Sequence, residues 1–174
     1  PCGHVLFLST RSGSSQAWLI DPKGGEAQQL TDLPLDVSNL EVAPQLESMI
    51  FTMDVYPDMT VAETVAKDEE IAAAKTTGMV YDELMFRHWD HWEDGKRTHV
   101  FKRGVFAFDD EPVDMTPGLD ADTPTHPWGG SEEYAVSPDG SQLLFTAKVL
   151  PGSEPAWSTD YDIYTVPTDG SGAF

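Results

Sequence analysis

A dense run of polar and aromatic side chains, Arg87–Asp94, combines the residue types from which binding sites are built. His88 and His91 stand three residues apart, and on a helix this spacing would place two imidazoles on one face for a metal ion. No third ligand has a specified position, which a metal centre needs. The alternative is that Trp89 and Trp92 anchor this segment against a neighbouring sheet, and it is favoured because aromatic rings with a polar handle commonly pack in this way. The sequence therefore predicts no metal site.

Two adjacent acids, Glu132 and Glu133, stand directly before an expected strand that starts at Tyr134. Ionised carboxylates only accept hydrogen bonds, so they are suited to holding an ammonium group. The alternative is a solvated loop, because exposed acids are ordinary on protein surfaces. Residue types alone leave both interpretations open.

A serine nucleophile on a strand–turn–helix elbow would need the pattern Gly-x-Ser-x-Gly. Gly129-Gly130-Ser131 lacks the closing glycine, and Ser12-Gly13-Ser14 lacks the opening one. A catalytic triad is recognised by its geometry, but no serine in this sequence has the local context that would expose it. We therefore expect no catalytic residue and no cofactor in this segment.

The elements that would position these residues repeat along the chain. Tyr134–Phe145 and Leu40–Phe51 each read as an alternating apolar strand, a short polar turn containing proline, and a second apolar strand. A further strand carrying an aromatic residue is expected after each unit, at 105–108 and 163–166. Small antiparallel units that recur in this way are typical of a β-propeller, whose blades bury their faces against one another. The sequence predicts an all-β fold, specifically a partial propeller.

The length limits how much of a propeller is present. A blade takes roughly 40–50 residues and a ring usually takes about four to eight blades, so 174 residues hold about two to three blades. We expect one fragment of a propeller domain over 1–174, with blade strands in 4–54 and 98–168. Such a fragment cannot close a ring, and its open sheet edges would allow self-association.

The period of the pattern changes between 57 and 97. Thr60 and Glu63 fit a capping box, in which the threonine hydroxyl and the glutamate satisfy free amides at the start of a helix. The alanine-, glutamate- and lysine-rich stretch that follows favours a helix that ends near Gly78, a plausible C-cap. We therefore expect a helical insertion over 57–97 between two strands of the second blade.

The charge of the chain is one-sided, with 30 acidic against 10 basic residues and a formal net charge of −20. Such a surface repels phosphate backbones and offers no basic patch to anionic lipid. Nucleic-acid partners and membrane insertion are therefore not expected, and no apolar run approaches the roughly 18 residues of a membrane span. The acidity fits a solubility or salt-tolerance trait, or the attraction of cationic ligands. Cys2 is the only cysteine, which excludes an intrachain disulfide.

Two motifs carry a resemblance to a known family. The run Tyr81–Arg97, which reads YDELMFRHWDHWEDGKR, is followed by the pattern Gly-Gly-x-Glu-x-Tyr-x-x-Ser-Pro-Asp-Gly over 129–140. Together they resemble the propeller domain of prolyl-oligopeptidase-family serine peptidases, in particular bacterial dipeptidyl-peptidase and acylaminoacyl-peptidase-like members. The resemblance covers nearly the whole chain, although this sequence contains no hydrolase domain.

The resemblance implies a function for the segment. It would gate short peptide substrates and orient them, by recognition of the free amino terminus, for an α/β-hydrolase domain of the same parent chain. The substrate-binding residues implied are Glu132, Glu133, Arg87 and Asp90. Periplasmic or secreted localisation is implied, with the cytoplasm as the alternative. The alternative function is a non-catalytic periplasmic propeller that scaffolds protein complexes.

Overall fold

The computed structural model describes residues 3–43 and 47–172. Cys2 and the turn expected at 44–46 lie outside the described residues. The elements in chain order are β1 (Val5–Ser9), β2 (Gln16–Ile20), β3 (Gln28–Gln29), β4 (Ser38–Ala43), β5 (Ser48–Val55), α1 (Val61–Ala73), β6 (Arg87–His88), β7 (His91–Trp92), β8 (Arg97–Gly104), β9 (Val113–Asp114), the 3₁₀ turn η2 (Ser131–Glu133), β10 (Tyr134–Val136), β11 (Gln142–Ala147), the 3₁₀ turn η3 (Glu154–Ala156) and β12 (Asp162–Pro167).

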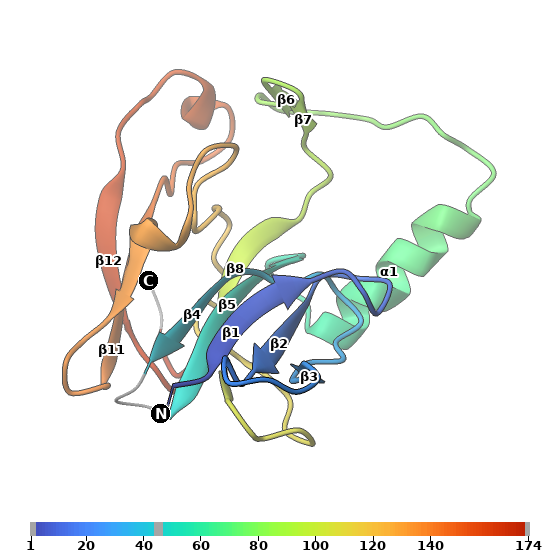
Figure 1. Cartoon of the computed structure of the whole chain (residues 1–174). Helices are drawn as coiled ribbons and strands as arrows, with labels where there is room; N and C mark the ends of the chain where they lie inside the picture. Colours follow the sequence, from blue (N-terminus) through green and yellow to red (C-terminus); the bar gives the residue numbers. More distant parts are fainter. Residues whose placement is uncertain (1–2, 44–46, 173–174) are drawn as a thin grey trace.

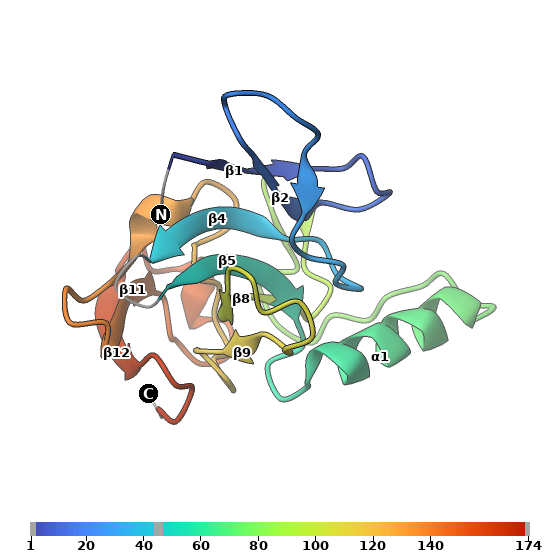
Figure 2. The same ribbon diagram turned by 60° about the horizontal axis from the view of Figure 1, so that its bottom comes forward.

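The strands form small antiparallel sheets in which sequence neighbours pair, except that β5 pairs with β8 (Figures 1 and 2). The first sheet has the order β1-β2-β3, the central sheet β4-β5-β8-β9 and the third sheet β10-β11-β12, and β6-β7 is a separate hairpin. The expected all-β, partial propeller-like architecture is confirmed, and the described residues form no closed barrel. Among them, no helix has the length and hydrophobicity needed to cross a bilayer.

The central sheet is buried on both faces because it lies between the other two sheets. Successive side chains of a strand point to opposite faces, and β5 follows this rule. Phe51 and Met53 pack into a hydrophobic core shared with the first sheet, whereas Ile50 packs into a second core shared with the third sheet. This double burial leaves Asp54 as the one exposed residue of the strand, since each face of β5 meets a hydrophobic neighbour.

Two adjacent basic residues of β8 tie the central sheet to both of its neighbours. The Arg103 guanidinium donates a hydrogen bond to the carbonyl of Leu30 beside the first sheet. The Lys102 ammonium donates to the carbonyl of Thr168 at the end of the third sheet. Because successive side chains of β8 point to opposite faces, Lys102 and Arg103 form hydrogen bonds to different sheets.

The β10–β11 hairpin turns at the predicted Ser137-Pro138-Asp139-Gly140 sequence. Gly140 has a φ of 76°, in the left-handed region that glycine occupies most easily. The Asp139 carboxylate accepts hydrogen bonds from the Ser137 hydroxyl at 2.6 Å and from the Ser141 amide at 3.0 Å. These bonds lower the pKa of Asp139 to about 2.

The insertion between β5 and β8 is only partly helical. The capping box is confirmed, since the Thr60 side chain accepts from the Glu63 amide and the Glu63 side chain accepts from the Thr60 amide. The expected helix end near Gly78 is wrong, because α1 ends at Ala73 and Ala74 is already extended. The chain then runs without regular structure to the β6–β7 hairpin, and α1 with this connection projects away from the sheets (Figures 1 and 2).

The strand expected at 105–108 is also wrong. β8 ends at Gly104, and the Ala107 amide bonds back to the Gly104 carbonyl at 3.2 Å. Phe106 and Phe108 are exposed and face each other with ring centroids 6.5 Å apart. The fourth strand of the central sheet is β9 instead. Aromatic residues favour strands, but here only the Val105 amide continues towards β5, with a bond to the Glu47 carbonyl at 3.3 Å, before the chain turns.

Candidate functional site

Arg87 and Asp90 lie in the β6–β7 hairpin and make local contacts. The Arg87 Nε donates to the Trp89 carbonyl at 2.7 Å, and its guanidinium lies 5.2 Å from the Trp92 ring centroid. The Asp90 carboxylate lies 3.4 Å from the His91 imidazole Nε2. The hairpin is therefore shaped partly by the two residues that the resemblance implies for substrate binding.

The two histidines of the hairpin do not lie on a helix. His88 and His91 are paired across β6 and β7, so the helical geometry considered for a metal is wrong. The described residues contain no group of three or more His, Cys, Asp or Glu side chains arranged to hold a metal ion.

Glu132 and Glu133 lie in η2, immediately before β10, where their environments differ. The Glu133 carboxylate accepts hydrogen bonds from the Thr125 amide at 2.8 Å and the Thr125 hydroxyl at 3.1 Å. Glu132 is exposed, and within the described part of the chain its side chain makes no hydrogen bond or ion pair. The two acids therefore lie directly before the strand as predicted, and Glu133 is hydrogen-bonded to Thr125.

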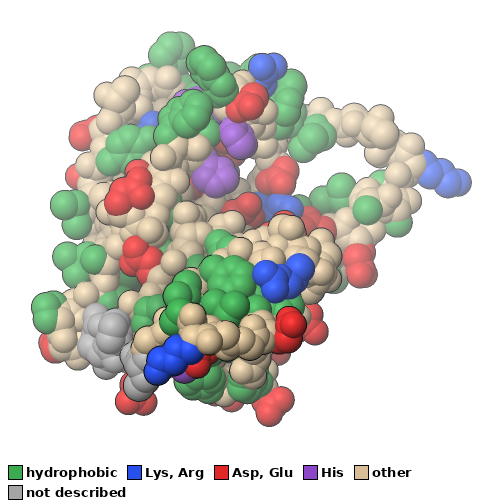
Figure 3. Space-filling model, in the orientation of Figure 1, with side chains coloured by type: hydrophobic (Ala, Val, Ile, Leu, Met, Phe, Trp, Pro, Cys, Tyr) green, Lys and Arg blue, Asp and Glu red, His purple; other side chains and the backbone are tan. Residues whose placement is uncertain are grey.

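Ring contacts bring the hairpin to the loop that precedes η2. Trp89 meets Trp128 edge to face with centroids 6.1 Å apart, and His91 meets His126 in the same way at 6.0 Å. Figure 3 shows histidine side chains next to one another on this face. Trp89 thus contacts a loop and not a sheet, and its side chain stays 71% exposed. The predicted anchoring of Trp92 against a sheet is wrong, because its ring packs within the insertion against Tyr81 and Phe86.

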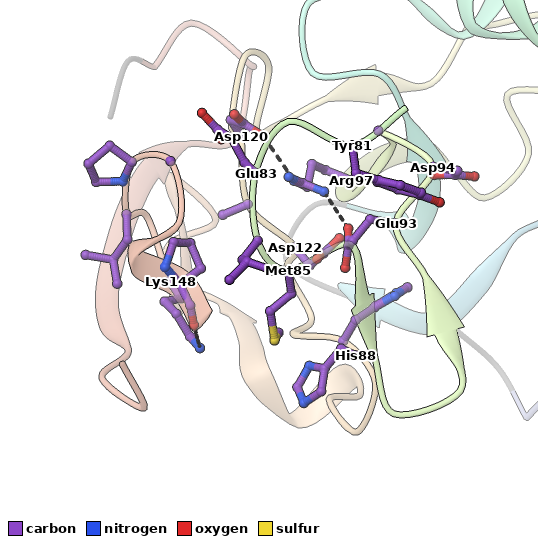
Figure 4. Close-up of a pocket in the computed structure, with 18 of the residues that line it drawn as sticks. Tyr81, Glu83, Met85, His88, Glu93, Asp94, Arg97, Asp120, Asp122 and Lys148 are labelled. Carbon is purple, nitrogen blue, oxygen red and sulfur yellow. Dashed lines mark hydrogen bonds and ion pairs between the residues drawn. The ribbon is translucent and has the colours of Figure 1, made fainter. Parts of the chain in front are cut away.

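A pocket of about 630 Å³ opens beside this contact (Figure 4). Its walls come from the insertion, from the loop around 120–126 and from the segment after β11 around 148–155. None of the four predicted site residues lines it. His88 and His126 do, so the hairpin and loop that carry the predicted residues also border the pocket.

Arg97, at the start of β8, organises one wall of the pocket. Its guanidinium bonds to the Glu93 carboxylate at 2.9 Å and to the Asp120 carboxylate at 3.0 Å (Figure 4). Burial alone would lower the pKa of Arg97, but the carboxylates of Asp122, Asp120 and Glu93 raise it. Arg97 is therefore protonated, and the carboxylates bonded to it balance its positive charge.

Thr98 connects this wall to the loop that carries His126. Its amide donates to the Asp122 carboxylate at 2.9 Å, and its hydroxyl bonds to Asp54 at 2.8 Å and to the His126 Nε2 at 2.7 Å. Burial raises the pKa of Asp122 and also that of Glu93, in the latter case against the lowering effect of Arg97. The wall therefore carries carboxylates that a cation or a hydrogen-bond donor would stabilise.

The opposite wall carries the other basic residue of the pocket, Lys148. Its ammonium donates to the carbonyls of Pro155 at 3.2 Å and Ser158 at 2.8 Å, and lies 4.9 Å from the Tyr161 ring centroid. Both basic side chains of the pocket are thus engaged, while Asp82 and Glu83 add further acids to its lining. The pocket is suited to groups that donate hydrogen bonds.

Sequence reasoning missed Arg97, Asp120 and Asp122. Arg97 was visible only as the last residue of the motif, and the two aspartates resemble many others in a chain with 30 acidic residues. Only the pairing of β5 with β8 and the return of the loop beside Thr98 bring these side chains together.

No family model matches the chain. It is 26% identical over 165 residues to the dipeptidyl-peptidase 5 of Porphyromonas endodontalis, a match that covers 92% of the chain and 23% of the relative. It is 29% identical over 185 residues to the dipeptidyl-peptidase 5 of Aspergillus fumigatus, covering 96% of the chain and 25% of the relative. It is 29% identical over 174 residues to the dipeptidyl-peptidase 4 of Giardia intestinalis, covering 87% and 22%.

The predicted resemblance to dipeptidyl peptidases is therefore confirmed over nearly the whole chain. The chain spans about a quarter of the length of these relatives, with shares between 22% and 25%.

Proposed function

We propose that this chain is the substrate-gating segment of a serine peptidase of the dipeptidyl-peptidase type, within the wider prolyl-oligopeptidase family. Its role is to admit short peptides and to hold their free amino terminus, while an α/β-hydrolase domain of the same parent chain cleaves them. The observation that carries the proposal is the similarity to dipeptidyl peptidases across 92% of the chain. By the same resemblance we propose that the protein is periplasmic or secreted.

The structure supports this role through the position of the acids. Glu132 and Glu133 lie in η2 immediately before β10, and the hairpin that carries Arg87 and Asp90 contacts the loop just before them. We include Arg87 and Asp90 in the substrate-binding set because of this contact. A carboxylate bonded to an ammonium forms a charge-assisted hydrogen bond, stronger than a neutral one.

The charge of the surface supports the same ligand. A net charge of −20 attracts a cationic peptide end over distances of about a Debye length, roughly 8 Å at physiological ionic strength. The pocket beside the hairpin adds acceptors in Asp82, Glu83 and Asp122. Short peptides carry backbone amides that such acceptors can bind.

The test compares free and amino-blocked forms of one peptide in the full-length protein that contains this segment. We expect kcat/KM to be higher for the free form, and the double variant with Glu132→Gln and Glu133→Gln to remove that preference. Equal values for both forms in the unmodified protein would contradict amino-terminus recognition. A full-length protein with no peptidase activity would instead support the scaffold function, in which exposed sheet edges pair with other chains.

A further inference from the structure

The connection from α1 to β6 forms one wall of the pocket without belonging to any sheet (Figure 1). Its stretch 79–85 lines the pocket, and residues 74–80 are all exposed. We infer that residues 75–85, called the strap, are the gate of this pocket: they move away from the wall that carries Lys148 to admit a short peptide, and then return to that wall. The inference rests on the proposed function, to which it adds the moving element and the contact that closes it.

Few interactions hold the strap in place. Within the part of the chain that the structure describes, the backbone of residues 75–83 makes no hydrogen bond, whereas β8 is paired with β5 along its whole length. The Tyr81 ring packs within the insertion, with its centroid 5.7 Å from that of Phe86 and 6.4 Å from that of Trp92. Segments with few hydrogen bonds and little burial open at a low cost in free energy. The strap can therefore move while the sheets stay folded.

The strap touches the wall that carries Lys148 through two neighbouring residues. The Leu84 amide donates a hydrogen bond to the Ser153 hydroxyl at 3.2 Å. Beside it, the Glu83 carboxylate lies next to Gly152, where a Cβ would be 3.6 Å from the Glu83 Oε1. A single hydrogen bond of this kind shifts an equilibrium by about two- to tenfold. The closed position is therefore favoured by the Leu84–Ser153 bond, but only weakly.

The two ends of the moving segment are fixed by backbone hydrogen bonds. At one end, the Ala74 amide donates to the Ile71 carbonyl at 3.1 Å, in the last turn of α1. At the other end, the Glu93 amide donates to the Phe86 carbonyl at 3.1 Å and closes the β6–β7 hairpin. Movement is therefore confined between Ala74 and Phe86, and its largest effect is at 82–85, where the strap meets the facing wall.

Apolar side chains of the strap give a bound peptide a reason to close it. Met79, Val80 and Leu84 line the pocket, yet they are 58%, 86% and 40% exposed. A peptide in the pocket would cover part of this surface, and burial of apolar surface is favourable. A ligand shifts a conformational equilibrium only through contacts that differ between the two states. These side chains supply such contacts, since an open strap would carry them away from the peptide.

The first test locks the gate. Leu84→Cys and Ser153→Cys are combined with Cys2→Ser in the full-length protein that contains this segment. The hydrogen-bonded atoms of the two positions are 3.2 Å apart, which makes a disulfide accessible. We expect oxidation to lower kcat/KM for a short peptide by about tenfold or more, because a closed gate blocks entry and release, and reduction to restore it. Leu84→Cys with Cys2→Ser, oxidised in the same way, is the control.

The second test measures opening without substrate turnover. Ala121 lines the pocket and is 6% exposed, so the thiol of Ala121→Cys should react with a bulky reagent mainly when the gate is open. Its rate of labelling, followed by mass spectrometry of the peptide that contains position 121, should fall about tenfold in the locked protein. The rate should rise about two- to tenfold in Ser153→Ala, which removes the hydrogen bond. Ser38→Ala, at an exposed serine of β4, is the matched control.

The outcomes decide separate points. Unchanged labelling in both the locked protein and Ser153→Ala would overturn the gate, whether or not the protein cleaves peptides. Slower labelling in the locked protein but no change in Ser153→Ala would overturn the Leu84–Ser153 bond as the contact that closes it. Slower labelling in the locked protein with unchanged kcat/KM would overturn the role of the strap in substrate entry. Slower labelling in a full-length protein without peptidase activity would support the moving strap and overturn the proposed function instead.

Discussion

The β5–β8 pair and the β6–β7 hairpin are both antiparallel, and the second is inserted within the first. β5 and β8 are paired from Ser48 opposite Gly104 to Val55 opposite Arg97, with aromatic side chains fully covered: Phe51 is 0% exposed. The β6–β7 hairpin has two residue pairs, and its tryptophans Trp89 and Trp92 are 71% and 58% exposed. Aromatic residues therefore form a hydrophobic core in one region and a contact surface in the other.

The largest effect that tests this contrast is expected from Phe51→Ala. Phe51 is buried and stacks on Phe101 with centroids 6.3 Å apart. Removal of a buried phenylalanine ring should lower the free energy of unfolding by about 3–5 kcal/mol, measured by denaturant titration. Trp92→Ala is the control, and a loss of similar size there would show that the hairpin contributes to the core.

Thr60→Ala tests how much the N-cap stabilises the first turn of α1. The Thr60 hydroxyl caps the Glu63 amide, and loss of such a cap usually costs about 1 kcal/mol. Because Thr64 is the only helical residue of α1 that is buried, we expect faster hydrogen exchange within α1 and little change in the sheets. Equal acceleration in β5 would contradict the peripheral position of the helix.

Two aspartates should give opposite pH dependences. Burial raises the pKa of Asp122 above its ordinary value of 3.8, so the unfolded chain loses this proton first. The contribution of Asp122 to the free energy of unfolding therefore falls as the pH rises from about 4 through the raised pKa. Asp122→Asn should reduce this fall and keep an acceptor for the Thr98 amide.

Asp139 is the comparison, because hydrogen bonds lower its pKa from 3.8 to about 2. Its stabilising contribution is present above pH 3.8 and is lost as the pH falls towards 2. Asp139→Asn should reduce that acid-side loss and leave the Asp122 effect in place. Denaturant titrations across the acid range measure both slopes, and an Asp122→Asn profile identical to that of the unmodified protein would contradict the buried carboxylate.

The smallest effect on global stability is expected from Trp89→Ala. Exposed substitutions usually change the free energy of unfolding by less than about 0.5 kcal/mol, and Trp89 is 71% exposed. Its ring contact with Trp128 nevertheless holds the hairpin against the loop. Limited proteolysis should therefore cut the 86–93 segment faster in this variant, and an unchanged rate would show that the His91–His126 contact suffices.

Local signals allowed part of the fold to be predicted from the sequence. The Ser137–Gly140 turn and the Thr60–Glu63 capping box depend on neighbouring residues, and the structure has both. The end of α1 was mispredicted because the helix stops at Ala74 without the glycine cap that Gly78 suggested. Residues 105–108 have strand propensity, but a strand also needs a partner, which sequence alone does not supply.

For the candidate site, the sequence predicted the place of two residues. Glu132 and Glu133 are adjacent and precede a recognisable strand, and the structure has them directly before β10; their role in binding stays a prediction. The Arg97, Glu93 and Asp120 cluster was missed because its members are spread over 93–120 and meet only in the folded chain. The contact of the hairpin with the 125–130 loop likewise depends on tertiary structure.

The neighbouring residues Lys102 and Arg103 give the central sheet a mechanical role. One reaches the carbonyl of Thr168 and the other the carbonyl of Leu30, so a single strand is fastened to the sheets on either side of it. Withdrawal of β8 would open both hydrophobic cores at once and release both fastenings. The three sheets should therefore unfold as one cooperative unit that depends on β8. The insertion should unfold locally and independently of them.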